Sequence, residues 1–451
     1  MEFIGSEMSG NIVQLFPENR VFQPVAHFFR LGDSGHRQLA AIQAAGGFTA
    51  SRVVVDASRL EAQKELVDAL KASGAEIVLD TKVAELAAPL KCGGYARGAP
   101  WAEGELLGPD SFKKGNSSDI FGQIARFSIE KNVDVVLAPT HYIGDKNFEH
   151  WLDLDVRSCL ELRKALDREG GSAIAIDYGL ILPHTWLADA DKRGQILSGL
   201  IDLPFDNLWI RASGFYPNAG GLSQKKYIGA LARFHNLGRP VVIDYLDGMV
   251  ALATVAFGAT AGIAHGIGER GRFDASSWHK EPIQKDDGSG FGLTKRMSIP
   301  LLDKSLTEPE LRILASASGA RRLINCGDLC CSHGLEDMIK DPKRHAIFQS
   351  MKLVDELNQK PDLSRAEHYV DDMLVKSVSF ANRVAKLKPK QNSVGNSNVN
   401  IENLMNRLKK HSEDKSKIHQ ALERLLEDMG DGYSRSKPLY RSTTKQRERK
   451  Q

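Results

Sequence analysis

SRVVVDASRLEAQKELVDALKASGAEIVLDT, residues 51–81, determines the fold class, because two apolar β-branched runs enclose one amphipathic segment. The runs 51–58 and 75–81 have the composition of buried parallel strands. Between them, Leu60, Val67 and Leu70 lie on one face of a helix expected over 60–73, and Gly74 marks its end. The stretch therefore predicts a strand, a helix and a second strand of a parallel sheet covered by helices.

The same alternation continues along the chain, with further helices expected over 156–169 and 224–236. The predicted strands are SRVVVDAS (51–58), AEIVLDT (75–81), DVVLAPTH (134–141), SAIAIDY (172–178), NLWIRASG (207–214), PVVIDYLD (240–247) and AGIAHGIG (261–268). Seven strands favour a closed parallel (β/α)8 TIM-like barrel over an open doubly wound sheet. For the eighth strand, 322–326, 297–302 and the segment before Ser51 remain as alternatives.

Four regions follow from this order of patterns. They are an N-terminal segment (1–50), the barrel (51–305), a helical extension containing Cys and His (306–390), and a polar linker, terminal helix and basic tail (391–451). The extension opens on a capping pattern, in which Thr307 precedes Glu310. The terminal helix, expected over 401–429, has apolar residues at heptad-like spacing, interrupted by His411 and Lys415. It is expected to pair weakly with a partner or to dock on the body.

Composition is that of a globular protein, with 42% hydrophobic and 26% charged residues, so we expect a large core rather than disorder. The net charge is only +3, too small to predict a nucleic-acid or membrane partner by itself. Positive charge gathers at residues 434–451, a solvated tail or a contact to nucleic acid. An odd cysteine count, and the lack of an export signal or membrane span, predict a cytoplasmic protein with no membrane partner.

Ionisable residues stand at or just past the ends of most predicted strands. They are Asp56, Asp80, His141, Asp177 with Tyr178, Arg211, Asp244 and His265. In parallel barrels this end of the strands forms the working face. We therefore select Asp80, His141, Asp177, Asp244 and His265 as candidate catalytic residues, the aspartates as general acid or base and the histidines as proton shuttles. The alternative for each residue is a helix cap or an ion pair.

An anion site is predicted near Arg211, whose planar guanidinium can hold a carboxylate or phosphate with two hydrogen bonds. Structural pairing with Asp244 or Asp177 is the alternative role. The run GATAGIAHGIGERGRFD supplies glycines after the seventh predicted strand, where barrel phosphate sites commonly lie. Its Gly266, Gly268 and Arg270 complete the candidate anion site. Glycine-rich turns at barrel corners also serve geometry alone.

A second cluster of candidate residues lies in INCGDLCCSHGLEDMIKDPKRH (324–345). Cys326, Cys330, Cys331 and His345 offer the thiolate and imidazole ligands of a structural zinc site. The spacing is not that of a CxxC pair, and adjacent cysteines are poor joint ligands, so Cys330 or Cys331 is expected to be spare. Plain buried thiols are the alternative.

These features together resemble the barrel of the tRNA-guanine transglycosylase superfamily, over about 51–345. The resemblance implies base exchange in nucleic acid and a Cys3His zinc site beyond the late strands. Asp80 matches the aspartate that recognises the base and handles protons in that family, although Thr81, Lys82 and Val83 replace the Ser-Gly-Gly that follows it there. Where the family has its nucleophilic aspartate, this chain has His265 between Ala264 and Gly266.

Three functions follow as hypotheses. The first is a barrel enzyme acting on a nucleoside-like, nucleic-acid or phosphorylated ligand, related to base transglycosylases but without their nucleophile. The second is a divalent-metal hydrolase, with His141, Asp177, Asp244 and His265 as ligands. The third is a non-catalytic module that binds nucleic acid or a protein partner through its terminal helix and basic tail.

Overall fold

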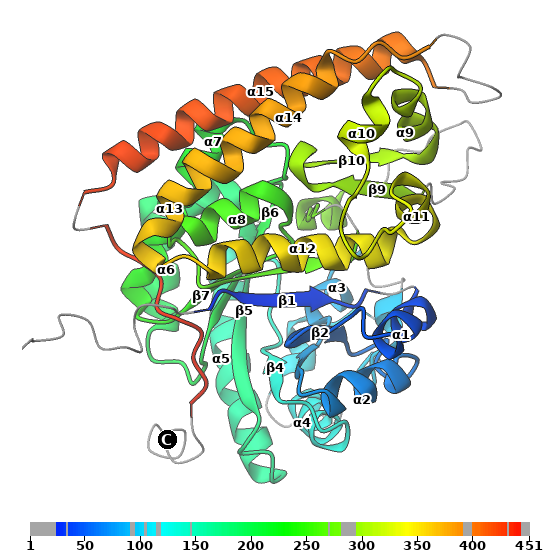
Figure 1. Ribbon diagram of the computed structural model, residues 1–451. Helices are drawn as coiled ribbons and strands as arrows, with labels where there is room; N and C mark the ends of the chain where they lie inside the picture. The colour runs from blue at the N-terminus through cyan, green and yellow to red at the C-terminus, as the bar shows by residue number, and fades with distance from the viewer. Residues whose placement is uncertain are drawn as a thin grey trace, which may run out of the picture.

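The computed structural model describes residues 24–32, 35–90, 95–102, 106–113, 119–144, 147–268, 271–280, 295–390, 399–430 and 433–442. Eight parallel strands close into a barrel in chain order, which confirms the predicted (β/α)8 architecture (Figure 1). The barrel strands are β1 (Ala26–Arg30), β2 (Arg52–Asp56), β3 (Glu76–Asp80), β4 (Val135–Leu137), β5 (Ala175–Pro183), β6 (Leu208–Ser213), β7 (Val241–Asp244) and β8 (Gly262–Gly266).

The eighth strand is β1, which comes from the segment before Ser51 and pairs with both β2 and β8. The predicted start of the barrel at residue 51 is therefore wrong by one strand. The other two alternatives for this strand are excluded. Residues 322–326 overlap helix α10 (Ala320–Ile324), and residues 297–302 contribute to β9 (Arg296–Ile299), which forms a separate antiparallel pair with β10 (Lys304–Thr307). The predicted barrel end at 305 thus falls inside this pair.

Side chains alternate between the interior and the outer face of the barrel, as in any pleated strand. The apolar interior layer consists of Ala26, Phe28, Val54, Val78, Val135, Leu137, Ala175, Trp209, Val242 and Ala264. On five of these strands, the residue two positions closer to the carboxyl end also points into the barrel. These five are Arg30, Asp56, Asp80, Arg211 and Asp244, and all are buried. We call this end of the barrel the mouth and the opposite end the floor.

Helices cover the outer face of the barrel, and the largest apolar cluster lies between them and the strands. The barrel helices are α1 (His36–Ala44), α2 (Lys64–Ala72), α3 (Val83–Leu86), α4 (Ile120–Glu130), α5 (Phe148–Arg168), α6 (Ala190–Leu200), α7 (Gly221–Ala232) and α8 (Gly248–Ala256). Short 3-10 turns at Tyr95–Gly98, Pro109–Phe112 and Ala275–His279 belong to the loops that follow β3 and β8.

The extension after β8 is helical, as predicted, apart from its antiparallel strand pair. Its helices are α9 (Glu308–Ala315), α10, α11 (Leu335–Lys340), α12 (Pro342–Asn358), α13 (Arg365–His368), α14 (Val375–Ala385) and α15 (Ile401–Asp428). A second apolar cluster, separate from that of the barrel, joins β9, β10, α9, α11, α14 and the start of α15.

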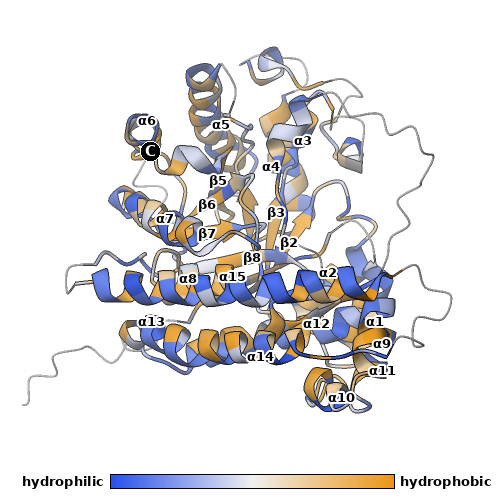
Figure 2. Cartoon of the chain, turned by 90° about the horizontal axis from the view of Figure 1, so that it is seen from above, coloured by the Kyte–Doolittle hydropathy of each residue, from blue (hydrophilic) through white to orange (hydrophobic). Residues whose placement is uncertain are grey.

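The terminal helix α15 docks on the body of the protein, along α14 and α7 (Figure 1). Leu404, Leu408 and Leu422 are buried there, and the side of α15 seen in Figure 2 is largely hydrophilic. The two residues that interrupt its heptad pattern also contact the body. Lys415 forms a buried ion pair with Asp303, and His411 Nε2 lies 2.6 Å from the carbonyl oxygen of Leu302. Among the described residues, no helix combines the length and hydrophobicity needed to cross a membrane.

Candidate functional site

Two arginines and two aspartates form a hydrogen-bonded network in the barrel mouth, which we call the arginine–aspartate network. Arg30 donates to both oxygens of Asp244, each at 2.7 Å, and to Asp80 Oδ2 at 3.0 Å. Arg211 donates to Asp244 Oδ2 at 2.7 Å and to Asp80 Oδ2 at 2.8 Å. Asp80, Arg211 and Asp244, which the sequence placed at strand ends, therefore meet in one place. Of the two structural pairings considered for Arg211, the one with Asp244 is present, whereas Asp177 pairs with Arg441 instead.

Lys82 and Tyr245 border this network, and both have left-handed backbone angles, with φ of 58° and 61°. Such angles are costly for side chains with a Cβ, and they concentrate at functional sites when the fold enforces them. The Lys82 Nζ lies 3.4 Å from the hydroxyl of Tyr245, and it also pairs with Asp56 and Glu85. The guanidinium of Arg30 lies over the Tyr245 ring at 4.1 Å. Two strained residues that follow different strands, β3 and β7, thus meet at the mouth.

The neighbouring cations determine the charge of the network. Burial by itself would raise the pKa of Asp80, but Arg211, Lys82 and Arg30 outweigh it and lower that pKa below its ordinary value. Burial is likewise outweighed at Asp244, whose pKa Arg30 and Arg211 lower. Burial raises the pKa of Tyr245 to about 12, so its phenol is neutral at pH 7. Both aspartates of the network are therefore ionised.

Aromatic side chains pack beside the mouth. Phe273 stacks on Tyr245 with ring centroids 5.0 Å apart, and Trp278 meets Phe273 edge to face. A Cβ at Gly271 would lie 2.7 Å from the Asp247 nitrogen, so only glycine permits this close approach. Behind the aromatic group, Asp80, Thr140, Gly179 and Arg211 line a recess with room for about one water molecule. The described mouth is thus filled almost entirely by its own side chains.

Asp177 does not belong to this group, because β5 continues beyond the predicted strand end to Pro183. The residue of β5 at the level of the mouth is Gly179. Asp177 lies toward the floor, where it accepts hydrogen bonds from Trp209 Nε1 at 2.8 Å and from Asn207 Nδ2 at 2.9 Å. It also pairs with Arg441 at 2.9 Å. The position expected for Asp177 is therefore wrong, because the strand end was placed too early.

His265 points to the outer face of the barrel, since the inward residues of β8 are Ala264 and its alternate neighbours. Its Nε2 lies 2.9 Å from His27 Nε2 and 3.0 Å from Ser350 Oγ on α12. Its Nδ1 lies 2.9 Å from the carbonyl oxygen of Gly266. Burial lowers the pKa of His265. The prediction that His265 lies in the mouth is therefore wrong, because its side chain points away from the barrel interior.

His141 lies outside the network too, in a pair with Asp155 of α5. Its Nδ1 is 2.6 Å from Asp155 Oδ1, and its backbone nitrogen donates to Asp155 Oδ2 at 3.0 Å. Its ring stacks on Trp151 and meets Phe112 edge to face. The side chain is buried, and its Nε2 makes no hydrogen bond to a described residue. The five candidate catalytic residues thus occupy four separate places, and only Asp80 and Asp244 share one.

The glycine turn of the candidate anion site is described only in part, because Arg270 lies outside the described residues. Gly266 ends β8, and its carbonyl faces the ring of His265. Gly268 has a φ of 69°, and a Cβ there would lie 3.6 Å from the Cβ of Ala346 on α12. These contacts give both glycines a role in the turn beside α12. The guanidinium of Arg211 is meanwhile occupied by Asp80 and Asp244.

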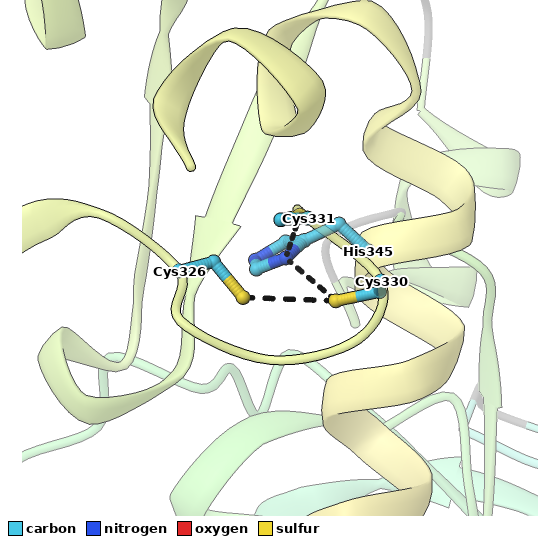
Figure 3. A group of neighbouring side chains, drawn as sticks. All are labelled: Cys326, Cys330, Cys331 and His345. Atoms are coloured by element: carbon cyan, nitrogen blue, oxygen red, sulfur yellow. Dashed lines mark hydrogen bonds between the residues drawn. The ribbon is translucent and has the colours of Figure 1, made fainter. Parts of the chain in front are cut away.

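The cysteine cluster converges as a potential metal centre. Figure 3 shows Cys326, Cys330, Cys331 and His345 pointing toward one another, and their ligand atoms all lie within 4.8 Å of each other. The Sγ atoms of Cys330 and Cys331 lie 3.7 and 3.4 Å from His345 Nδ1. The expectation that one adjacent cysteine is spare does not hold for this geometry, because both thiols face the imidazole. His333 is exposed and pairs with Asp337 instead.

Residues around the cluster orient its ligands. The His345 Nε2 lies 2.9 Å from the Ser298 carbonyl oxygen on β9, so a proton on Nε2 leaves the Nδ1 lone pair for a metal ion. Gln349 donates to Asp328 at 2.7 Å and to Cys326 Sγ at 3.4 Å. A hydrogen bond from Cys331 lowers the pKa of Cys330 to about 4. A thiolate and an oriented imidazole are the ligand types that zinc prefers.

Sequence reasoning missed three residues of the mouth, Arg30, Lys82 and Tyr245, and it noted Asp56 only as a charged strand end. AHFFR (26–30) has the pattern of the other strands, an apolar run that ends in a charge, and could have revealed Arg30. Lys82 is the second residue after β3 and Tyr245 the first after β7, but their left-handed backbone is not visible in the sequence. Comparison with protein-family models and with curated protein sequences gave no match for this chain.

Proposed function

We propose that this chain is a barrel enzyme that acts at its mouth on a nucleoside-like ligand, free or within a nucleic acid. The observation that carries the proposal is the arginine–aspartate network bordered by the strained residues Lys82 and Tyr245. Buried ion pairs with backbone strain are costly, and such cost is typical of catalytic sites at the carboxyl ends of barrel strands. In this proposal, Asp80, which lines the recess, accepts a hydrogen bond from a ring nitrogen of the ligand, and Asp244 holds Arg30 and Arg211 in position.

The chemistry of the mouth favours a planar base over a phosphate as the group recognised. Arg211 already pairs with two carboxylates, so a phosphate would have to displace them. Tyr245, Phe273 and Trp278 form an aromatic group beside the network, in which the rings cover one another. In this proposal the group opens on binding, so that a base stacks on one of its rings. A relation to base transglycosylases is part of the proposal, without covalent attack from β8, whose inward positions carry no ionisable side chain.

The two other hypotheses receive less support. Within the described residues, only the cysteine cluster gathers three or more groups that could hold a metal ion. His141, Asp177 and His265, proposed as hydrolase ligands with Asp244, each have other partners. A binding module that uses the terminal helix would need a free apolar face, but α15 buries that face against α14 and α7.

We also propose that Cys326, Cys330, Cys331 and His345 bind a structural zinc ion. These four residues can hold a metal ion, and their ligand types favour zinc. The cluster belongs to the apolar core of the extension rather than to the mouth, so the ion would stabilise the extension. The four described cysteines are free thiols, which supports a reducing, cytoplasmic setting as part of the proposal.

The test of the function uses the full chain and a panel of guanosine, adenosine, cytidine and uridine, their 5′-monophosphates, and inorganic phosphate. We expect a nucleoside to raise the melting temperature of the wild type, and phosphate alone to have no effect. Asp244→Asn should remove this shift and any base exchange or hydrolysis, while its circular dichroism stays unchanged. Asparagine removes the charge and keeps one acceptor oxygen for the arginines, whereas its amide nitrogen is a donor and replaces no acceptor. The melting temperature without ligand is therefore measured beside the circular dichroism to establish that the variant is folded.

Asp68→Asn is the matched control, because Asp68 is an exposed carboxylate on α2. It should behave as the wild type in every assay. The proposal is refuted if no nucleoside binds, or if Asp244→Asn binds and turns over nucleosides as well as the wild type. Binding of phosphate alone that requires Arg211 would favour a phosphorylated ligand instead.

A further inference from the structure

Asp56 lies beside the arginine–aspartate network but is bonded differently from its members. It ends β2, and the strand register places it opposite Asp80 on β3. Its side chain points into the barrel above Val54 and is only 6% exposed. It therefore shares the buried mouth with three cations and three other carboxylates.

The contacts of Asp56 are long. Its nearest cations in the described structure are Arg30 Nη1 at 3.6 Å and Lys82 Nζ at 3.8 Å, both beyond hydrogen-bond distance. Asp80 and Asp244 instead accept hydrogen bonds of 2.7 to 3.0 Å from the arginines. The fourth carboxylate, Glu85, contacts the Lys82 ammonium directly. Asp56 is thus the carboxylate whose negative charge is stabilised least.

The charges of the described mouth do not balance when every group is ionised. Its cations are Arg30, Lys82 and Arg211, and its carboxylates are Asp56, Asp80, Glu85 and Asp244. One negative charge is left over in a buried place, where an uncompensated charge is costly. A single proton on one carboxylate makes the set neutral. That proton goes to the carboxylate with the weakest stabilisation.

We infer that Asp56 is the carboxyl group of the mouth that carries a proton at neutral pH, and that it is the proton donor of the site. The second part rests on the proposed function. Burial raises the pKa of Asp56. The cations Lys82 and Arg30 oppose this change, whereas the carboxylates Asp80 and Glu85 add to it. The net rise agrees with the charge balance. A neutral acid beside an ionised aspartate is the pairing that acid–base catalysis uses.

The chemical step is a single proton transfer. The O–H bond of Asp56 breaks as a bond forms between that proton and the leaving atom of the ligand. Asp56 then becomes a carboxylate, and the ammonium of Lys82, 3.8 Å away, stabilises the new charge. Lys82 keeps its own proton, because its ammonium pairs directly with Glu85 and lies near Asp80, and these charges oppose the effect of burial on its pKa. Lys82 is therefore a positioning residue, not the acid.

Infrared spectroscopy of the full chain at pH 7 tests the protonation without any ligand. Burial also raises the pKa of Asp155 and of Asp177, so each variant is compared with the wild type by difference spectrum. The carbonyl stretch of a neutral carboxyl group should lose intensity in Asp56→Asn and keep it in Glu85→Gln. Unchanged intensity in Asp56→Asn, a loss in Glu85→Gln instead, or no band in the wild type would overturn the inference.

A second measurement does not depend on the folding of Asp56→Asn. Wild-type protein labelled with carbon-13 at aspartate carboxyl groups should show, among its buried aspartates, a carboxyl resonance of Asp56 that titrates well above the ordinary range near pH 4. Asp56→Glu should remove this resonance. If all aspartates titrate at or below that range, the inference is wrong.

The donor role has its own readout. For a nucleoside that the wild type turns over, Asp56→Asn should lower kcat by about 100-fold or more, with little change in KM. An unchanged kcat would reject the donor role even if the proton is present. Failure of every nucleoside to bind would reject the proposed function and the donor role, whereas the infrared result would still decide the protonation of Asp56.

Discussion

Asp244 accepts hydrogen bonds from Arg30 and Arg211 inside the barrel, and both of its oxygens take part. Moving such charges out of water costs several kcal/mol per ion, which close pairing has to offset. The pairing works only as a set, because removal of either arginine leaves a buried carboxylate without compensation, at a cost of about 3–5 kcal/mol. Each of these four side chains therefore contributes to stability as well as to the proposed chemistry.

Stability should depend on the ionisation of this pair of aspartates at acid pH. Their folded pKa values are lowered, so between those values and about pH 4 the unfolded chain binds protons that the folded chain does not. Stability is then fully present above about pH 4 and is lost as the pH falls. Thermal melts from pH 7 to pH 3 should show a steeper acid loss for the wild type than for Asp244→Asn. Equal slopes in the two proteins would contradict this account.

At this scale, the sequence predicted which strands end in charges but not which charges meet. Asp80, Arg211 and Asp244 converge because each lies two residues beyond an inward apolar residue of its strand. His265 has the opposite parity, and the sequence alone does not show which parity faces inward when both faces are apolar. The predicted position of Asp177 was wrong because GLIL (179–182) continues the strand, whereas the prediction ended it at Tyr178.

Among the elements, residues 433–442 form an extended segment across the floor of the barrel, which we call the C-terminal strap. Arg441 pairs with Asp177 and Glu76, each within 2.9 Å. Asn207 exchanges two hydrogen bonds with the backbone of Tyr440, at 2.8 and 3.0 Å. Leu439 packs against the interior apolar layer. Part of the segment predicted to be a solvated or nucleic-acid-binding tail is therefore built into the fold.

Removal of the Arg441 side chain should destabilise the protein more than removal of another basic residue of the strap. Arg441→Ala leaves Asp177 buried without a cation, and we expect a loss of about 3 kcal/mol in the free energy of unfolding. Lys437→Ala is the matched control, because Lys437 is exposed on the same strap, and it should change stability by less than about 0.5 kcal/mol. Urea unfolding followed by circular dichroism measures both. Equal stability of the two variants would mean that the strap does not hold the floor.

The elements with strong local signals were predicted well. The capping box at Thr307 and Glu310 is present, and α15 begins at the predicted residue. The eighth strand was harder, because β1 lies before the regular alternation of strands and helices begins. Its pairing with β8 depends on contacts between distant parts of the chain, which local patterns do not contain.

For the molecule as a whole, the extension has an apolar core of its own, and the cysteine cluster lies in it. Helix α12 connects this core to the barrel. It carries His345 and Gln349 toward the cluster, and Ser350 toward His27 and His265 on the strands that close the barrel. A metal ion in the cluster would therefore fix α12 on the outside of the β1 and β8 pair.

Purified protein should contain zinc in a one-to-one ratio, and Cys326→Ser should lose it. Cys159→Ser should retain it, because Cys159 is a buried thiol on α5, away from the cluster. Elemental analysis measures both. Removal of the metal by a chelator should lower the melting temperature of the extension and leave the circular dichroism of the barrel in place. Zinc content that is unaffected by Cys326→Ser would exclude the cluster as the site.

The strap also has a consequence during protein synthesis. Arg441 follows Asp177 by 264 residues, so the ribosome makes the floor of the barrel long before the residue that neutralises it. At roughly 5–20 residues per second, that interval is on the order of 10–50 s. During this time the carboxylate of Asp177 remains open to water, and the nascent barrel is an incomplete intermediate. Completion of this fold is therefore a late event in translation, even though its strands lie in the first two thirds of the chain.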